Sequence, residues 1–87
     1  MGKLEVKLVS ASWCAPCKAL KPVLQGLCEE HSLSYTVYDL DSKEGSEFAS
    51  QYGVRSVPTM FVLEDGKITN TLVGSKTKQE LEKALNV

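Results

Sequence analysis

The sequence has no apolar run long enough to cross a membrane, and its N-terminal segment lacks the apolar core that a signal peptide requires. Its charge is nearly balanced, with 10 Lys and Arg against 11 Asp and Glu, and both signs are mixed along the chain. Such a balance gives no reason to expect a surface for nucleic acid or for lipid headgroups. We therefore expect a cytoplasmic, monomeric protein that binds neither nucleic acid nor membranes.

The chain also lacks the cysteine pattern of a secreted protein held together by disulfides. It has three cysteines, an odd number, and a single His in 87 residues. Small secreted domains instead carry paired cysteines in larger numbers. With 43% hydrophobic residues, the chain can build one small core and is too short for a second. We expect residues 1–87 to form a single domain.

Two of the three cysteines stand two residues apart, in the segment Trp13-Cys14-Ala15-Pro16-Cys17-Lys18. This segment lies between residues 4–10, which are typical of a strand, and apolar residues at helical spacing from Cys17 to about Glu30. A helix N-terminus carries unpaired N–H groups and a partial positive charge, which favour a thiolate. We predict that Cys14 is an exposed, attacking thiolate. Cys17 is expected to be buried one turn further on, where it can form a disulfide with Cys14.

Patterns along the rest of the chain predict an α/β protein. A strand, a helix and a second strand in succession indicate a parallel pair, and Asp65-Gly66 is a two-residue hairpin signal between two later strands. Thr77 and Glu80 form the capping box of a last helix. The expected order is βαβαββα, a four-stranded mixed sheet flanked by three helices. The expected strands are residues 4–10, 35–39, 59–64 and 67–73, and the expected helices are residues 17–30, 44–52 and 77–85.

At this point the sequence resembles the thioredoxin family. Trp-Cys-Ala-Pro-Cys-Lys differs at one position from the Trp-Cys-Gly-Pro-Cys-Lys signature of thioredoxins, and Val57-Pro58-Thr59 follows some forty residues later. Asp65-Gly66-Lys67 and Val73-Gly74 extend the resemblance over nearly the whole chain. It implies a minimal thioredoxin fold that begins after the first strand and helix of most members, an architecture shared with glutaredoxins.

The resemblance implies a thiol-disulfide oxidoreductase that reduces disulfides in protein substrates through the Cys14-Cys17 couple. A thioredoxin reductase, which uses NADPH and a flavin, would recharge this redox-active disulfide, and the chain itself would bind no cofactor. Pro16 supplies no charge that would stabilise the reduced form in the way that a His does in disulfide isomerases. We therefore expect a reducing couple, nearer the roughly −270 mV of thioredoxin than the about −120 mV of the periplasmic oxidant.

The resemblance also implies which residues surround the two sulfurs. In thioredoxins the proline at the position of Pro58 is cis and lies against the cysteine pair, where the residue before it pairs with the target peptide. The reading from the residues alone is an ordinary trans proline that opens a strand. Substrate-binding residues carried over from the family form a flat apolar docking surface around Cys14. They are Trp13, Ala15, Pro16, Val57, Gly74 and Ser75.

The sequence departs from the family at two places that matter to the chemistry. Thioredoxins carry a buried Asp six residues before the attacking cysteine and a Lys at the end of the next strand, where this chain has Leu8 and Asp39. A Trp that usually stands four positions before that cysteine is Ser10 here. The buried Asp is thought to accept the proton of the resolving thiol. We hypothesise that Asp39, on the neighbouring strand, takes over this proton relay. The alternative is that Asp39 is a solvated carboxylate at the end of its strand.

A zinc site is the competing interpretation for the cysteines, because Cys14, Cys17, Cys28 and His31 are ligand types at usable pair spacings. A helix from residue 17 to 28 would separate the backbones of its two cysteines by roughly 16 Å, too far to share one metal ion. We therefore expect no metal. Cys28 is then a small buried apolar residue, and His31 is a solvated residue at the helix end.

Two other functions remain open on the sequence. One is a glutaredoxin-like oxidoreductase reduced by glutathione, although the motif lacks the Pro-Tyr dipeptide of glutaredoxins, and Ser75 stands where they have a second Gly. The other is an accessory subunit that docks a larger enzyme by the flat surface, without redox chemistry. Disulfide isomerisation is disfavoured by the dipeptide between the cysteines.

Overall fold

The computed structural model describes residues 4–87, and its elements follow the predicted order βαβαββα. Each strand lies within a residue of its expected bounds. The first helix begins two residues and the second one residue earlier than expected, and the third begins one residue later, after the N-cap Thr77. The elements are β1 (Leu4–Ser10), α1 (Ala15–Glu30), β2 (Ser34–Asp39), α2 (Lys43–Gln51), β3 (Thr59–Glu64), β4 (Lys67–Val73) and α3 (Lys78–Leu85).

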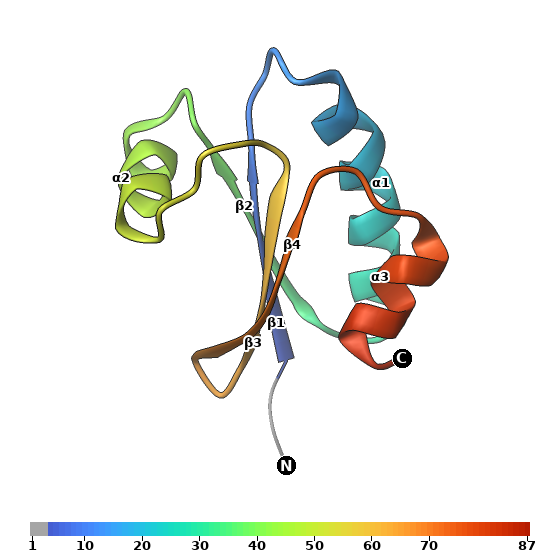
Figure 1. Cartoon of the computed structure of the whole chain (residues 1–87). Helices are drawn as coiled ribbons and strands as arrows, with labels where there is room; N and C mark the ends of the chain where they lie inside the picture. The colour runs from blue at the N-terminus through green and yellow to red at the C-terminus, as the bar shows by residue number, and fades with distance from the viewer. Residues whose placement is uncertain (1–3) are drawn as a thin grey trace.

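The four strands form one mixed sheet in the order β2-β1-β3-β4. The β1 strand is parallel to β2 and antiparallel to β3, and β4 is antiparallel to β3. The strand directions place the ends of β1, β2 and β4 and the start of β3 at one end of the sheet, the upper end in Figure 1. The loop that carries the two cysteines leaves β1 at this end.

Helices cover both faces of the sheet, with α1 and α3 on one side and α2 on the other (Figure 1). The larger core lies beneath α1 and α3, and burial of its side chains is the main source of stability. Its members are Val6, Leu8, Leu20, Leu24, Leu27, Cys28, Met60, Val62, Leu81 and Leu85.

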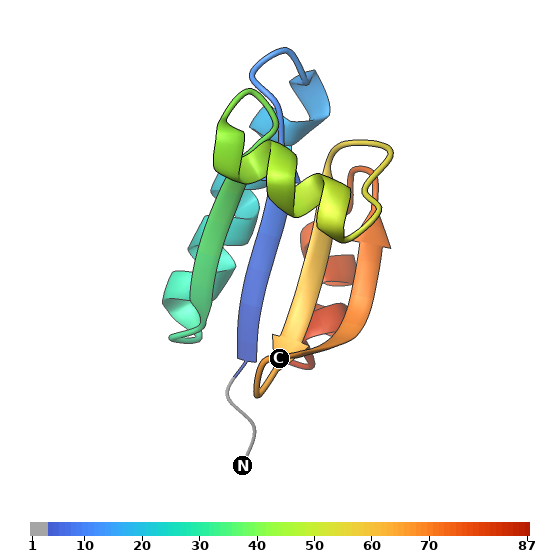
Figure 2. The same cartoon turned by 90° about the vertical axis from the view of Figure 1, so that its left-hand side faces the viewer.

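A smaller core lies beneath α2, which crosses the near face of the sheet in Figure 2. Phe48 of α2 stacks on Tyr38 of β2 with ring centroids 4.1 Å apart and meets Phe61 of β3 edge-on at 5.8 Å. Aromatic pairs favour both arrangements. Val9 and Leu63 complete this contact between α2 and the sheet.

The turns have the geometry that their residues predict. Asp65 and Gly66 both have positive φ, 53° and 83°, as a two-residue hairpin loop requires. Gly53 ends α2 with φ 67°, and the capping box at the start of α3 is formed, with Thr77 and Glu80 exchanging hydrogen bonds.

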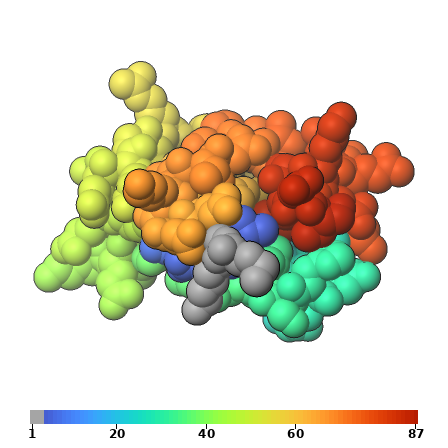
Figure 3. Space-filling view, turned by 90° about the horizontal axis from the view of Figure 1, so that it is seen from below, coloured from blue at the N-terminus to red at the C-terminus, as the bar shows by residue number. Residues whose placement is uncertain are grey.

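The end of the molecule remote from the cysteines is shown in Figure 3. The β3–β4 hairpin and the C-terminal part of the chain occupy much of this face, beside the turn that joins α1 to β2. Across residues 4–87, none of the helices combines the length and the apolar character needed to span a bilayer.

Candidate active site

A tight turn delivers Cys14 to the start of α1. The backbone N–H of Cys14 donates to the carbonyl of Ala11 at 3.1 Å, which closes the loop after β1. Cys14 is the N-cap of α1, with extended backbone angles, and Pro16 lies in the first turn, where a proline is tolerated because its missing N–H would be unpaired anyway. The helix therefore begins at Ala15, two residues before the start that apolar spacing predicts.

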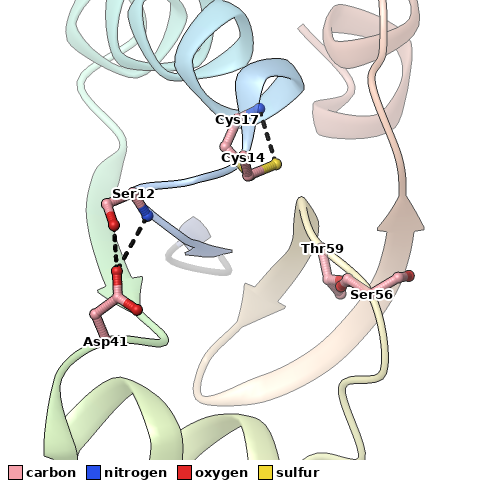
Figure 4. The surroundings of a disulfide bond; sticks show 6 residues. All are labelled: Ser12, Cys14, Cys17, Asp41, Ser56 and Thr59. Atoms are coloured by element: carbon pink, nitrogen blue, oxygen red, sulfur yellow. Dashed lines mark hydrogen bonds between the residues drawn. A yellow bond between two sulfur atoms is a disulfide. The ribbon is translucent and has the colours of Figure 1, made fainter.

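The two sulfurs meet at this helix end. The backbone N–H of Cys17 donates to Sγ of Cys14 at 3.3 Å, and a disulfide joins the two cysteines, whose Cα atoms are 5.3 Å apart (Figure 4). In the reduced protein the same N–H and the partial positive charge of the helix end stabilise a thiolate at Cys14. The arrangement can store two electrons as a dithiol and release them to another disulfide.

The expectation that Cys14 is exposed is wrong. Cys14 exposes only 5% of its surface, and Cys17 exposes 0%. Both cysteines and Ala11 form a small apolar cluster, against which Leu40 and Val57 pack. Those two residues come from loops that are distant in sequence, which is why local reasoning about a helix start does not reveal the cover.

Pro58 immediately precedes β3 and follows Val57, which packs against this cluster. The peptide bond between Val57 and Pro58 is cis, as the family resemblance implies. The backbone N–H of Gly74 donates to the carbonyl of Pro58 at 2.8 Å, and Oγ1 of Thr59 donates to the carbonyl of Ser56 at 2.6 Å. The loop before β3 is thereby fixed on both sides.

The expected docking residues differ in exposure. Trp13 exposes 69% of its surface, which disfavours a purely internal packing role for its ring. Val57 and Gly74 are half-buried, and Ala15, Pro16 and Ser75 are exposed. All six stand in loops or a first helical turn at the end of the sheet where β1 and β4 finish (Figure 1).

The position of the buried Asp of thioredoxins is apolar here. Leu8 is fully buried in the larger core with Leu20 and Leu24. Asp39 ends β2 opposite Ser10, is partly buried, and by strand alternation shares the α1 face with Tyr35. Its Oδ1 accepts a hydrogen bond from the backbone N–H of Asp41 at 2.8 Å, a turn-forming role. This contact supports the strand-end alternative, and the relay stays a prediction.

Sequence reasoning missed a contact between the loops that follow β1 and β2. Ser12 donates from its backbone N–H, at 3.3 Å, and from its hydroxyl to the same oxygen, Oδ2 of Asp41 (Figure 4). The hydrogen bonds from the side chain and backbone of Ser12 lower the pKa of Asp41. The sequence did hold a signal for this contact. Ser12 stands two positions after the end of β1, and Asp41 stands two positions after the end of β2, the parallel neighbour of β1.

Cys28 and His31 do not join the cysteine pair. Cys28 is 1% exposed in the larger core, and burial raises its pKa from 9.0 to about 11, so the thiol stays protonated. Tyr35 packs against the same core. Its pKa is raised to about 12, mainly by burial and to a smaller extent by the nearby Cys28. Within residues 4–87 no cluster of three or more His, Cys, Asp or Glu side chains could hold a metal ion.

A family model, several curated relatives and several solved structures that match this chain are all described as thioredoxins. The family model described as Thioredoxin matches residues 4–87. Thioredoxin of Bacillus subtilis is 42% identical over 76 residues, which cover 87% of this chain and 73% of that protein. Thioredoxin of Listeria monocytogenes is 34% identical over 76 residues, covering 87% and 74%.

Solved structures are similar along almost the whole chain. Fasciola hepatica thioredoxin superposes with a TM-score of 0.85 at 29% identity, over 98% of this chain and 80% of that one. Thioredoxin NaTrxh of Nicotiana alata gives 0.87 at 36% identity, over 99% and 73%. The comparisons favour a thioredoxin over the glutaredoxin-like alternative. The chain belongs to the thioredoxin family, and its Cys14–Cys17 pair makes it a thioredoxin-type disulfide oxidoreductase.

Proposed function

We propose that this protein reduces disulfides in other proteins, with Cys14 as the attacking thiolate and Cys17 as the resolving thiol. The observation that carries the proposal is the hydrogen bond from the N–H of Cys17 to Sγ of Cys14 at the N-terminus of α1. A donor and a helix end aimed at the same sulfur favour its charged form, which is the nucleophile.

The reaction runs in two exchanges. The Cys14 thiolate attacks one sulfur of the target disulfide, which breaks that bond, forms a mixed disulfide and releases the first target thiolate. Cys17 then loses its proton, attacks Sγ of Cys14 and releases the second target thiolate. Two electrons pass from the pair to the target, and the Cys14–Cys17 disulfide remains. Asp39 is our proposed acceptor for the proton of Cys17, in place of the carboxylate that Leu8 cannot supply.

The target is proposed to dock at the end of the sheet where Cys14 lies. Cys14 is 5% exposed, so the target disulfide must be brought directly onto its sulfur. The exposed Trp13, next to Cys14, offers apolar contact, and Val57 packs against the cysteine cluster. Pro58 follows Val57, and its carbonyl accepts from the N–H of Gly74. Ala15, Pro16 and Ser75 complete the proposed surface.

The recharging partner is proposed to be a thioredoxin reductase that carries NADPH electrons through a flavin, and the chain works in the cytoplasm as a single domain of residues 1–87. The chain needs no bound cofactor for this chemistry, since the electrons reside in the two thiols. The family assignment supports the reductase as partner, and the match of one family model to residues 4–87 supports a single domain.

A coupled assay tests the function. Reduction of insulin disulfides should depend on NADPH and thioredoxin reductase, and should fail when glutathione and its reductase replace them. Cys14→Ser should abolish turnover, and Cys17→Ser should accumulate the mixed disulfide with the target because the second exchange is blocked. Cys28→Ala, which keeps the buried position apolar, is the matched control and should keep its turnover. Turnover by Cys14→Ser, or turnover with glutathione alone, would refute the proposal.

A further inference from the structure

The loop that carries Cys14 is tied to the loop after β2 at two successive points. The backbone N–H of Leu40 donates to the carbonyl of Ser10 at 2.8 Å, which extends the β1–β2 pairing by one step. Beyond it, Ser12 donates twice to Oδ2 of Asp41. Ser12 and Asp41 are 29 residues apart in sequence, so the contact fixes one loop against the other.

The carboxylate is itself held in place. The N–H of Asp41 donates to Oδ1 of Asp39, and the next residue, Ser42, caps α2 by accepting from the N–H of Gly45 at 3.0 Å. Ser42 also donates to the carbonyl of Asp39, at 2.7 Å from its hydroxyl and 2.9 Å from its backbone N–H. Asp41 thus stands on a hydrogen-bonded turn between β2 and α2. Its bonds to Ser12 come in addition to the Leu40–Ser10 bond at the base of the cysteine loop and to the packing of Leu40 and Val57 on Ala11 and Cys14.

Ser12 lies within the turn that Cys14 closes on Ala11, two residues before the sulfur (Figure 4). The backbone of this turn sets where Cys14 stands at the N-cap, at the place where the N–H of Cys17 meets its sulfur. We propose that Asp41 is a positioning residue for Cys14: its hydrogen bonds to Ser12 hold the loop so that the reduced sulfur stays at the N-terminus of α1.

The carboxylate has two effects on Cys14 that act in opposite directions. Its hydrogen bonds position the sulfur and so favour the thiolate. Its negative charge, held against Ser12 two residues before Cys14, disfavours a second negative charge on the sulfur. The pKa of Asp41 is lowered, chiefly by its bonds to Ser12, so it is charged at neutral pH. A substitution that keeps an acceptor and removes the charge separates the two effects.

The experiment measures the pH dependence of Cys14 alkylation by iodoacetamide in the reduced protein, in a Cys28→Ala background, with the modified residue identified by mass spectrometry. Asp41→Ala should lower the rate near pH 7 about three- to tenfold, the range expected from one or two lost hydrogen bonds. Asp41→Asn keeps an acceptor oxygen and should react at least as fast as the parent. Ser12→Ala should fall between them, because its backbone N–H still donates.

Two controls separate positioning from general damage. Glu47→Ala removes an exposed negative charge from α2 without touching Ser12, and should leave the rate unchanged. Circular dichroism at the assay temperature confirms that each variant is folded, so a loss of stability alone does not alter the rate per molecule. The double variant Ser12→Ala/Asp41→Ala should react no more slowly than Asp41→Ala, because both changes break the same contact.

Because loss of the charge alone should speed the reaction, the deciding comparison is Asp41→Ala against Asp41→Asn, which both lack it. Equal rates and pH midpoints for these two variants would overturn the proposal, because the hydrogen bonds would then not be the cause. The inference rests on the proposed role of Cys14, but alkylation needs no reductase or target. A parent that alkylates as expected but fails the insulin assay would refute the proposed function and leave the role of Asp41 standing.

Discussion

At the scale of single residues, the same element, sulfur, behaves in two ways in this chain because its surroundings differ. Cys14 lies at a helix N-terminus with an N–H directed at its sulfur, and Cys28 lies in the apolar core. The first setting stabilises a thiolate and the second stabilises a neutral thiol. The two cysteines therefore differ in reactivity because of where they lie in the fold, although the side chain is the same.

Burial of Cys28 should make the stability of the protein fall at alkaline pH. The unfolded thiol loses its proton near pH 9.0, while the folded thiol keeps it up to about pH 11. The unfolded state thus binds fewer protons in this window, and the free energy of unfolding should decrease by about 2–3 kcal/mol as the pH rises through it. Urea unfolding between pH 8 and 11 measures this decrease.

A Cys28→Ala variant supplies the control for this titration. It should lose the decrease that begins near pH 9 and keep any decrease due to Tyr35, whose pKa is raised from 10.0 to about 12. An unchanged pH profile in Cys28→Ala would show that another group is responsible.

The proposed role of Asp39 as acceptor of the Cys17 proton can be tested by substitution. If it accepts the proton of Cys17, Asp39→Asn should slow the second exchange about tenfold or more and remove a step from its pH profile. Stopped-flow decay of the mixed disulfide between pH 5 and 8 measures this. A profile that matches the parent would leave Asp39 with its turn-forming bond to Asp41 alone.

At the scale of elements, the site depends on how α1 and α2 begin. The spacing of apolar residues predicted that α1 begins at Cys17. Cys14 as N-cap and Pro16 in the first turn explain why the helix begins earlier, at Ala15. The beginning of α2 depends instead on a close approach to β2. A Cβ atom at Gly45 would overlap the backbone carbonyl of Asp39, a constraint that no local pattern reveals.

Two glycines in helices should therefore respond in opposite ways to the same change. Gly45→Ala should destabilise the protein by about 1–3 kcal/mol, because backbone must move to admit the methyl group. Gly26→Ala in α1 meets no atom within 4 Å and should stabilise it by about 0.5–1 kcal/mol through helix propensity. Thermal unfolding of the two variants measures both effects, and a change of the same sign in both would contradict the described packing.

At the scale of the whole molecule, one end of the sheet gathers segments that are far apart in the sequence. Apolar residues at strand and helical spacing, the Asp65-Gly66 signal and the capping box of Thr77 and Glu80 predicted the elements, because each depends on neighbouring residues. The cover of Cys14 by Leu40 and Val57 could not be predicted in this way, since it depends on the strand order. The contact between Ser12 and Asp41 likewise needs the register that places Ser10 opposite Asp39.

The central claim is that the fold makes Cys14 the reactive thiolate among three cysteines. The most direct test is the pH dependence of alkylation of the reduced, unaltered protein, with each modified cysteine identified by mass spectrometry. We predict that Cys14 is modified first, with a pKa below the about 8.5 of a free cysteine, while Cys28 stays unmodified. A Cys14 that titrates at or above that value, or a Cys17 that reacts before it, would contradict the account.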